Sequence, residues 1–109
     1  MIPPTASFKN NLQLLPSVDD IAYIDIIDPA GVILDTIENK PGKQGSLVVY
    51  RYLAETFGNI DANAAAHGLE VFAEHTVDAK NRPGAHPNID RLLDAIESGK
   101  TLNVQIVRT

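Results

Sequence analysis

The sequence predicts one α+β domain, 1–109, built as a two-layer sandwich in which helices cover mainly one face of a mixed or antiparallel sheet of about four strands. Three observations lead to this class. Apolar residues recur at helical spacing in several segments, they alternate with polar residues in most segments expected as strands, and a chain of 109 residues has room for one hydrophobic core. Alternation is typical of strands with one wet face, which suits a sheet covered on one side.

The first expected elements are a short helix and a β-hairpin. An amphipathic helix is expected over 7–15, and Pro16 ends it. The hairpin follows over 18–37, around a turn at 28–31. Proline suits the second position of a type I turn, and Gly31 suits the left-handed position that completes a three-residue hairpin loop.

This turn also predicts which side chains face each other across the hairpin. The expected register pairs Ile26 with Leu34 and places Asp25 directly across from Asp35. Facing carboxylates cost stability, and a shared metal ion or proton would relieve them. Asp25 and Asp35 are therefore the metal or acid–base candidates of the sheet. A solvated outer face that discourages edge-to-edge pairing explains the same charges without a site.

The segment 46–57 has the clearest helical pattern, with Ser46 as its cap and Gly58 as its end. Val49 and Tyr52 widen its apolar stripe to a second face. Two apolar faces are hard to bury in a small domain, so we expect this helix to offer a surface to an unidentified protein partner or to a second copy of the chain in a homodimer. Packing of the tyrosines in the core is the simpler explanation.

The middle of the chain is expected to hold a helical turn, a strand and a long loop. Asp61 can cap a short turn that Gly68 ends. Apolar and polar residues then alternate over 69–74, which is the period of a strand. The segment 75–87 contains prolines and a glycine and is expected to be irregular.

A last helix and a last strand complete the expected order. Pro87 and Asn88 begin the helix, Gly99 ends it, and the strand alternates over 102–106. Strand, helix and strand in this order permit a right-handed crossover between parallel neighbours. The apolar stripe of the helix consists of Ile89, Leu92, Leu93 and Ile96.

Composition excludes several classes of function. Nine basic and fourteen acidic residues give a net charge of -5 without a basic cluster, so neither nucleic acid nor an anionic membrane surface is an expected partner. The chain has no cysteine, which excludes disulfides and thiolate catalysis. No apolar run approaches the ~20 residues that a bilayer requires, no secretory leader pattern opens the chain, and no cofactor is predicted. The cytoplasm is the expected location.

The densest group of proton-transfer residues lies around the expected loop. Glu74 and His75 stand where the loop begins, and His86 stands where it returns. If the loop folds back, a carboxylate can orient an imidazole that titrates near neutral pH. Glu74, His75 and His86 are therefore the catalytic candidates. Their spacing matches no metal or triad motif, and roles in a loop and beside a helix cap also explain them.

A glycine-containing basic loop precedes the expected helix 46–57. Lys40, Lys43, Gly45 and Ser46 are the anion-binding candidates, because lysines and free N–H groups at a helix start suit a phosphate or a carboxylate. The loop is not a P-loop, since no lysine directly precedes the serine. An ordinary capped turn needs the same glycine and serine.

Three runs of the chain resemble a family of short bacterial proteins catalogued as a domain of unknown function. They are ENKPGKQGS at 38–46, FAEHT at 72–76 and PGAHPNID at 83–90. The resemblance covers nearly the whole chain and implies a small, soluble bacterial protein. It brings no catalytic residue, cofactor or substrate.

Two functions of different classes follow. The first is a non-catalytic binding or protein-interaction module that contacts its partner through the helix 46–57 or the loop 75–87. The alternative is a small enzyme or a metal- or anion-binding protein that uses Glu74, His75 and His86, with the helix start holding an anionic substrate. Clustering of these groups in one pocket would favour the alternative.

Overall fold

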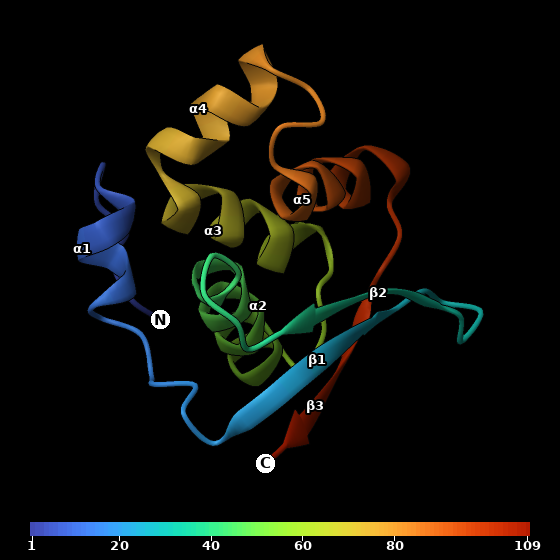
Figure 1. The fold of residues 1–109 in the computed structure, drawn as a ribbon. Helices are drawn as coiled ribbons and strands as arrows, with labels where there is room; N and C mark the ends of the chain where they lie inside the picture. Colours follow the sequence, from blue (N-terminus) through green and yellow to red (C-terminus); the bar gives the residue numbers. More distant parts are fainter.

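The computed structural model describes all 109 residues and contains five helices and three strands. Figure 1 shows the helices gathered on one side of the sheet. This arrangement confirms the α+β class, with a sheet smaller than expected. The elements in chain order are α1 (Phe8–Leu12), β1 (Ile21–Ile27), β2 (Ile33–Glu38), α2 (Gln44–Phe57), α3 (Ala62–Phe72), α4 (Glu74–Asn81), α5 (Pro87–Ser98) and β3 (Asn103–Arg108).

The sheet has the order β2-β1-β3, and both pairs of neighbours are antiparallel. The expected fourth strand is absent, and the expected parallel crossover is wrong. The last strand returns beside β1, and its start is extended by a bridge between Leu102 and Ile60 in the α2–α3 connection. β1 therefore lies in the middle of the sheet, and its Ile24 and Ile26 are fully buried.

The predicted hairpin forms, but a bulge shifts its register. The Asp28 N–H donates to the Val32 carbonyl as the turn predicts. The pairing then skips Leu34, so that Ile26 lies opposite Asp35. An extra residue in one strand moves every later pair by one position. The predicted face-to-face pair of Asp25 and Asp35 is therefore wrong.

Each of these two carboxylates has its own partner. Asp25 lies opposite Thr36, whose hydroxyl donates to Asp25 Oδ1 at 2.6 Å. Asp35 shares the inner side of the sheet with Ile26 and forms an ion pair with Arg91 on α5 at 2.6 Å. Neither carboxylate needs a metal ion to relieve repulsion from the other.

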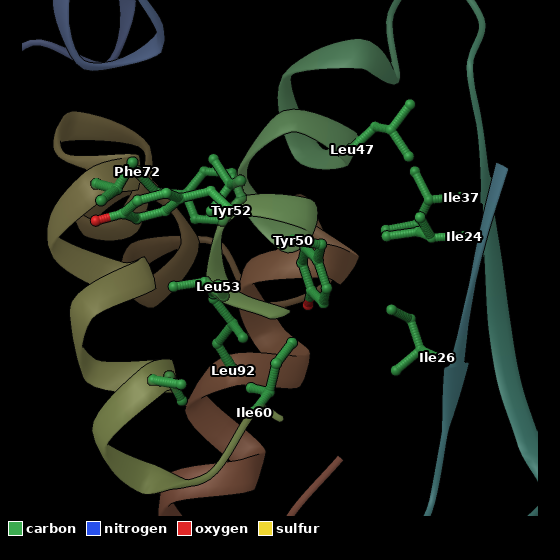
Figure 2. Packing of buried hydrophobic residues seen from close by; sticks show 14 of the residues in the cluster. Ile24, Ile26, Ile37, Leu47, Tyr50, Tyr52, Leu53, Ile60, Phe72 and Leu92 are labelled. Carbon is green, nitrogen blue, oxygen red and sulfur yellow. The ribbon is translucent and has the colours of Figure 1, made fainter. Parts of the chain in front are cut away.

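Helix α2 lies between the sheet and the other helices, and both of its apolar stripes are buried. Figure 2 shows Leu47 facing the sheet, while Tyr52 and Leu53 point towards the neighbouring helices. The expectation of an exposed partner surface on this helix is therefore wrong. Three consecutive exposed apolar side chains lie instead on the hairpin, at Val32, Ile33 and Leu34.

Residues 69–72, expected within a strand, belong to helix α3, which runs through Gly68. A Cβ atom at Gly68 would lie 2.7 Å from Leu53 Cδ1 and 3.0 Å from Leu92 Cδ1. This glycine is therefore the point where α3 approaches α2 and α5 closely, and it does not end the helix. The alternation of apolar residues misled the sequence interpretation because Val71 and Phe72 are both buried, on adjoining parts of one helix face.

The expected irregular loop is largely helix α4. It follows α3 after Ala73, which has a positive φ of 52°. The Thr76 hydroxyl donates to the Leu69 carbonyl at 2.6 Å and joins α4 to the end of α3. The irregular part of the expected loop is confined to the residues around Gly84, between α4 and α5. No helix in the structure is both long and apolar enough to cross a membrane.

The N-terminal segment is tied to α2 and α3 through Tyr52. Its hydroxyl accepts from the Ile2 N–H at 3.0 Å and lies 2.7 Å from His67 Nε2. Since the tyrosine oxygen already accepts from Ile2, its own hydrogen is available to a neutral His67. Burial lowers the pKa of His67, Glu70 opposes this effect, and the amino terminus adds to it.

We expect the protein to lose stability as the pH falls below the ordinary histidine value of 6.5. A histidine with a lowered pKa stays neutral in the fold while the unfolded chain takes up the proton, so acid favours unfolding. The loss begins near the unfolded value and levels off below the folded pKa. Melting temperatures at pH 7.5 and 5.5 would measure it. His67→Gln should show a smaller acid-induced drop, and an unchanged drop would contradict this assignment.

Candidate functional site

A cavity of about 270 Å³ opens between α1, the start of α2, α4 and the start of α5. It joins segments that are distant in the sequence, since its lining runs from Phe8 on α1 to Ile89 on α5. The lining combines polar and apolar residues. The lining residues are Phe8, Gly42, Gly45, Ser46, Phe72, His75, Ala85, His86, Pro87, Asn88 and Ile89.

The cavity brings together residues from two separate predictions. Gly45 and Ser46 come from the anion-binding candidates, and His75 and His86 come from the catalytic candidates. Three other candidates do not line it. Lys40 pairs with Glu38 at 3.0 Å, Lys43 is exposed at the cap position of α2, and Glu74 Oε1 accepts from the Phe8 N–H at 2.7 Å.

The start of α2 is shaped by Gly45. A Cβ atom there would lie 3.2 Å from Phe8 Cε2, so the glycine lets the phenyl ring pack against the helix start. The helix begins at Gln44, two residues before the predicted cap. No side chain caps it, and Ser46 lies inside the first turn. The N–H groups of this first turn have no partner further back in the helix.

His86 is held by a carboxylate that the sequence interpretation did not assign to it. Its Nε2 lies 2.7 Å from Asp78 Oδ2 on α4, and Arg82 also binds Asp78. The hydrogen bonds from Arg82 and His86 hold the pKa of Asp78 well below its usual range. Asp78 therefore stays a carboxylate and orients the imidazole, leaving Nδ1 without a protein partner.

His75 stands beside His86 and against the apolar wall. The two imidazole centres are 5.6 Å apart, and His75 meets the Phe8 ring edge-on at 5.0 Å. Phe8 also stacks on Phe72 at 5.2 Å. The predicted pairing of Glu74 with the histidines does not form, because its carboxylate anchors the start of α1.

Sequence reasoning missed the aromatic wall and Asn88. Phe8 and Phe72 are far apart in the chain, and each has an ordinary place in a helical stripe. No local signal indicates that they meet. Asn88 offered one signal. A proline favours the first position of a helix, so the polar residue directly after it lies in the first turn, where its side chain can contact groups outside the helix.

A model of an uncharacterised protein family conserved in bacteria, DUF2322, matches residues 8–106. The chain belongs to this family. The match confirms the resemblance to a bacterial domain of unknown function and contains every residue that lines the cavity. Neither the curated proteins nor the solved structures include one that matches.

The cavity of this DUF2322 member has a distinct electrostatic character. No carboxylate lines it, although the chain has fourteen acidic residues, and two of the three histidines do. No group of three or more histidine, aspartate or glutamate side chains is arranged to hold a metal ion. What remains is a set of donors and two imidazoles beside an aromatic wall, which suits an anion with an apolar part.

Proposed function

We propose that this DUF2322 protein binds a small organic anion, such as a phosphate or carboxylate attached to an apolar group. One observation carries the proposal. The cavity gathers His75, His86 and Ser46 together with the aromatic rings of Phe8 and Phe72, and no carboxylate of this acidic chain lines it. The protein is then a binding module whose ligand is a small molecule.

The polar residues of the cavity support an oxyanion. The Ser46 hydroxyl, a ring nitrogen of His86 and both ring nitrogens of His75 have no hydrogen-bond partner in the protein. Each can donate to an oxyanion in a suitable protonation state or rotamer. The uncapped first turn of α2 adds backbone donors at Gly45 and Ser46, and Lys43 adds a nearby positive charge.

The apolar residues of the cavity support a ligand with a small hydrophobic body. Phe8, Phe72 and Ile89 line the cavity, and the two phenyl rings are already stacked on each other. A volume of about 270 Å³ lies just below the range of about 300 to 1,000 Å³ that accommodates drug-sized ligands. The cavity therefore fits a ligand of about one ring with its anionic group.

Phenyl phosphate is the first probe, with inorganic phosphate and phenol as its two halves. We expect phenyl phosphate to shift the amide resonances of Gly45 and Ser46 and to bind more tightly than phosphate, because it can use both the polar and the apolar lining residues. Phenol, which lacks the charge, should cause much smaller shifts at the same concentration. A titration followed by ¹H–¹⁵N NMR measures all three. Equal shifts from phenol and phenyl phosphate, or none from either, would overturn the proposal.

Variants distinguish binding in this cavity from non-specific electrostatic attraction of the anion to the protein. His86→Gln should weaken phenyl phosphate binding about tenfold, the size expected when a charge-assisted hydrogen bond is lost. Lys43→Ala should weaken it by about two- to fivefold, as for an exposed ion pair. Lys100→Ala is the matched control, because Lys100 is also exposed and lies beyond the far end of α5. Equal effects of the two lysine changes would contradict a role for the helix start.

The contact between Asp78 and His86 favours catalysis as a second candidate function. A carboxylate that orients an imidazole is the arrangement of a general base, and a base beside a bound ester could activate water. Phenyl phosphate tests this directly, since water attack on phosphorus would release phenol and inorganic phosphate. ³¹P spectra recorded during the titration distinguish binding alone from turnover. A protein partner and a homodimer stay predictions of the sequence.

A further inference from the structure

The side chain of Asn88 has a defined orientation in the cavity wall. Asn88 is the second residue of α5, and its Oδ1 accepts from Arg91 Nη1 at 2.9 Å. A guanidinium group only donates, so the amide oxygen must face Arg91 and the amide nitrogen must face away from it. The structure gives Asn88 Nδ2 no acceptor in the protein.

Arg91 is itself held on three sides. Its Nη2 donates to Asp35 on β2 at 2.6 Å, its Nη1 donates to the Tyr50 hydroxyl at 3.1 Å, and its guanidinium lies 5.6 Å from the centre of the Tyr50 ring. The Arg91 side chain is only 14% exposed. Such a side chain has little freedom to rotate away from Asn88.

Tyr50 holds the backbone of the same residue. Its hydroxyl donates to the Asn88 carbonyl, and burial raises the pKa of Tyr50 to about 12, so it remains a donor at neutral pH. The side chain and the main chain of Asn88 are thus both anchored by one network. Of its members Arg91, Tyr50 and Asp35, none lines the cavity.

We propose that Asn88 Nδ2 donates a hydrogen bond to an anionic oxygen of the ligand and that Arg91 is the positioning residue that aims it. This inference rests on the proposed function and adds a specificity determinant to it. An amide nitrogen carries no charge and only donates, so it favours an acceptor oxygen over an ammonium or another donor. The salt bridge between Arg91 and Asp35 connects Asn88, through Arg91, to the edge strand β2.

The test is a double-mutant cycle on the dissociation constant of phenyl phosphate. Asn88→Ala should weaken binding about tenfold, since it removes a hydrogen bond to a charged group. Arg91→Lys should weaken it about threefold, because lysine keeps the charge and loses the planar fork. If Arg91 acts through Asn88, the effect of Arg91→Lys disappears in the Asn88→Ala background.

A second variant separates binding from folding. Asn88→Asp keeps the shape and the acceptor for Arg91, and a carboxylate is favourable at a helix start, so the melting temperature should be maintained or raised. Phenyl phosphate binding should nevertheless fall more than tenfold. Unchanged binding by Asn88→Asp or by Asn88→Ala would overturn the inference, as would a full effect of Arg91→Lys in the Asn88→Ala background. If the wild-type protein binds no phenyl phosphate, the proposed function itself fails. If the wild type binds it and these variants bind it equally well, only the inference about Asn88 fails.

Discussion

Replacing Leu92 by alanine is expected to lower the free energy of unfolding by about 2 to 5 kcal/mol. Leu92 lies on α5 with no exposed surface, within the core shown in Figure 2. It reaches the point where α3 passes closest, since its Cδ1 is 3.0 Å from where a Cβ of Gly68 would be. Truncation removes apolar contacts from two helices that cannot both move in to fill the space. Urea denaturation measures the loss.

Leu93→Ala is the matched control for this experiment. Leu92 and Leu93 are neighbours with the same side chain, and helical spacing assigns both to the apolar stripe of α5. In the structure Leu93 is only partly buried. Its truncation should therefore cost clearly less than that of Leu92. Equal losses from the two variants would show that the packing of α5 differs from the one described.

Valine at Gly68 is expected to destabilise the protein by about 1 to 3 kcal/mol or more. Its Cβ would lie 2.7 Å from Leu53 Cδ1, closer than two carbon atoms can pack. Leu53 is fully buried, so its side chain has no free space to enter. Valine is used because alanine would gain about 1 kcal/mol of helix propensity over glycine and mask part of the effect. The loss is measured by urea denaturation.

The control uses the same helix without the close approach. Ala66→Val on the exposed side of α3 reports the helix cost of a β-branched side chain alone, which is below about 0.7 kcal/mol. Combining Gly68→Val with Leu53→Ala should cost less than the sum of the two single changes, because the alanine makes room for the valine. Additive losses would contradict steric conflict as the cause.

Several local features could be predicted because short-range chemistry determines them. The turn at 28–31 forms its predicted hydrogen bonds, and Asp61 caps α3 by accepting from the Ala64 N–H at 2.8 Å. Gly58 and Gly99 end their helices in the left-handed conformation. In each case neighbouring residues satisfy the backbone groups, so a window of a few residues contains the information.

The wrong predictions lie where distant packing decides. Glycine commonly ends helices, so the sequence predicts a helix end at Gly68, but here the missing Cβ admits Leu53 and Leu92 from other helices. Residues 69–72 then alternate by coincidence within the continued helix. The bulge at Leu34 likewise depends on the whole sheet, and it separates Asp25 from Asp35.

The candidate site divides in the same way. From the residues alone, the histidines and the glycine-containing helix start could be singled out, because their chemistry is intrinsic to the side chains and to a helix terminus. Only the tertiary structure placed His75, His86 and Ser46 around one cavity with Phe8. It also placed His86 Nε2 beside the Asp78 carboxylate, and it placed the Glu74 carboxylate at the start of α1, where it accepts from the Phe8 N–H.

The sequence by itself determined the α+β class, the hairpin turn, the helix ends at Gly58 and Gly99, and the family. The tertiary structure alone decided the number of strands, the register of β2, the continuation of α3 and the assembly of the cavity. The physical reason is the separation along the chain between the residues that interact. Caps and turns are satisfied within a few residues, whereas register, close helix approach and cavity lining depend on side chains that meet only after the chain has folded.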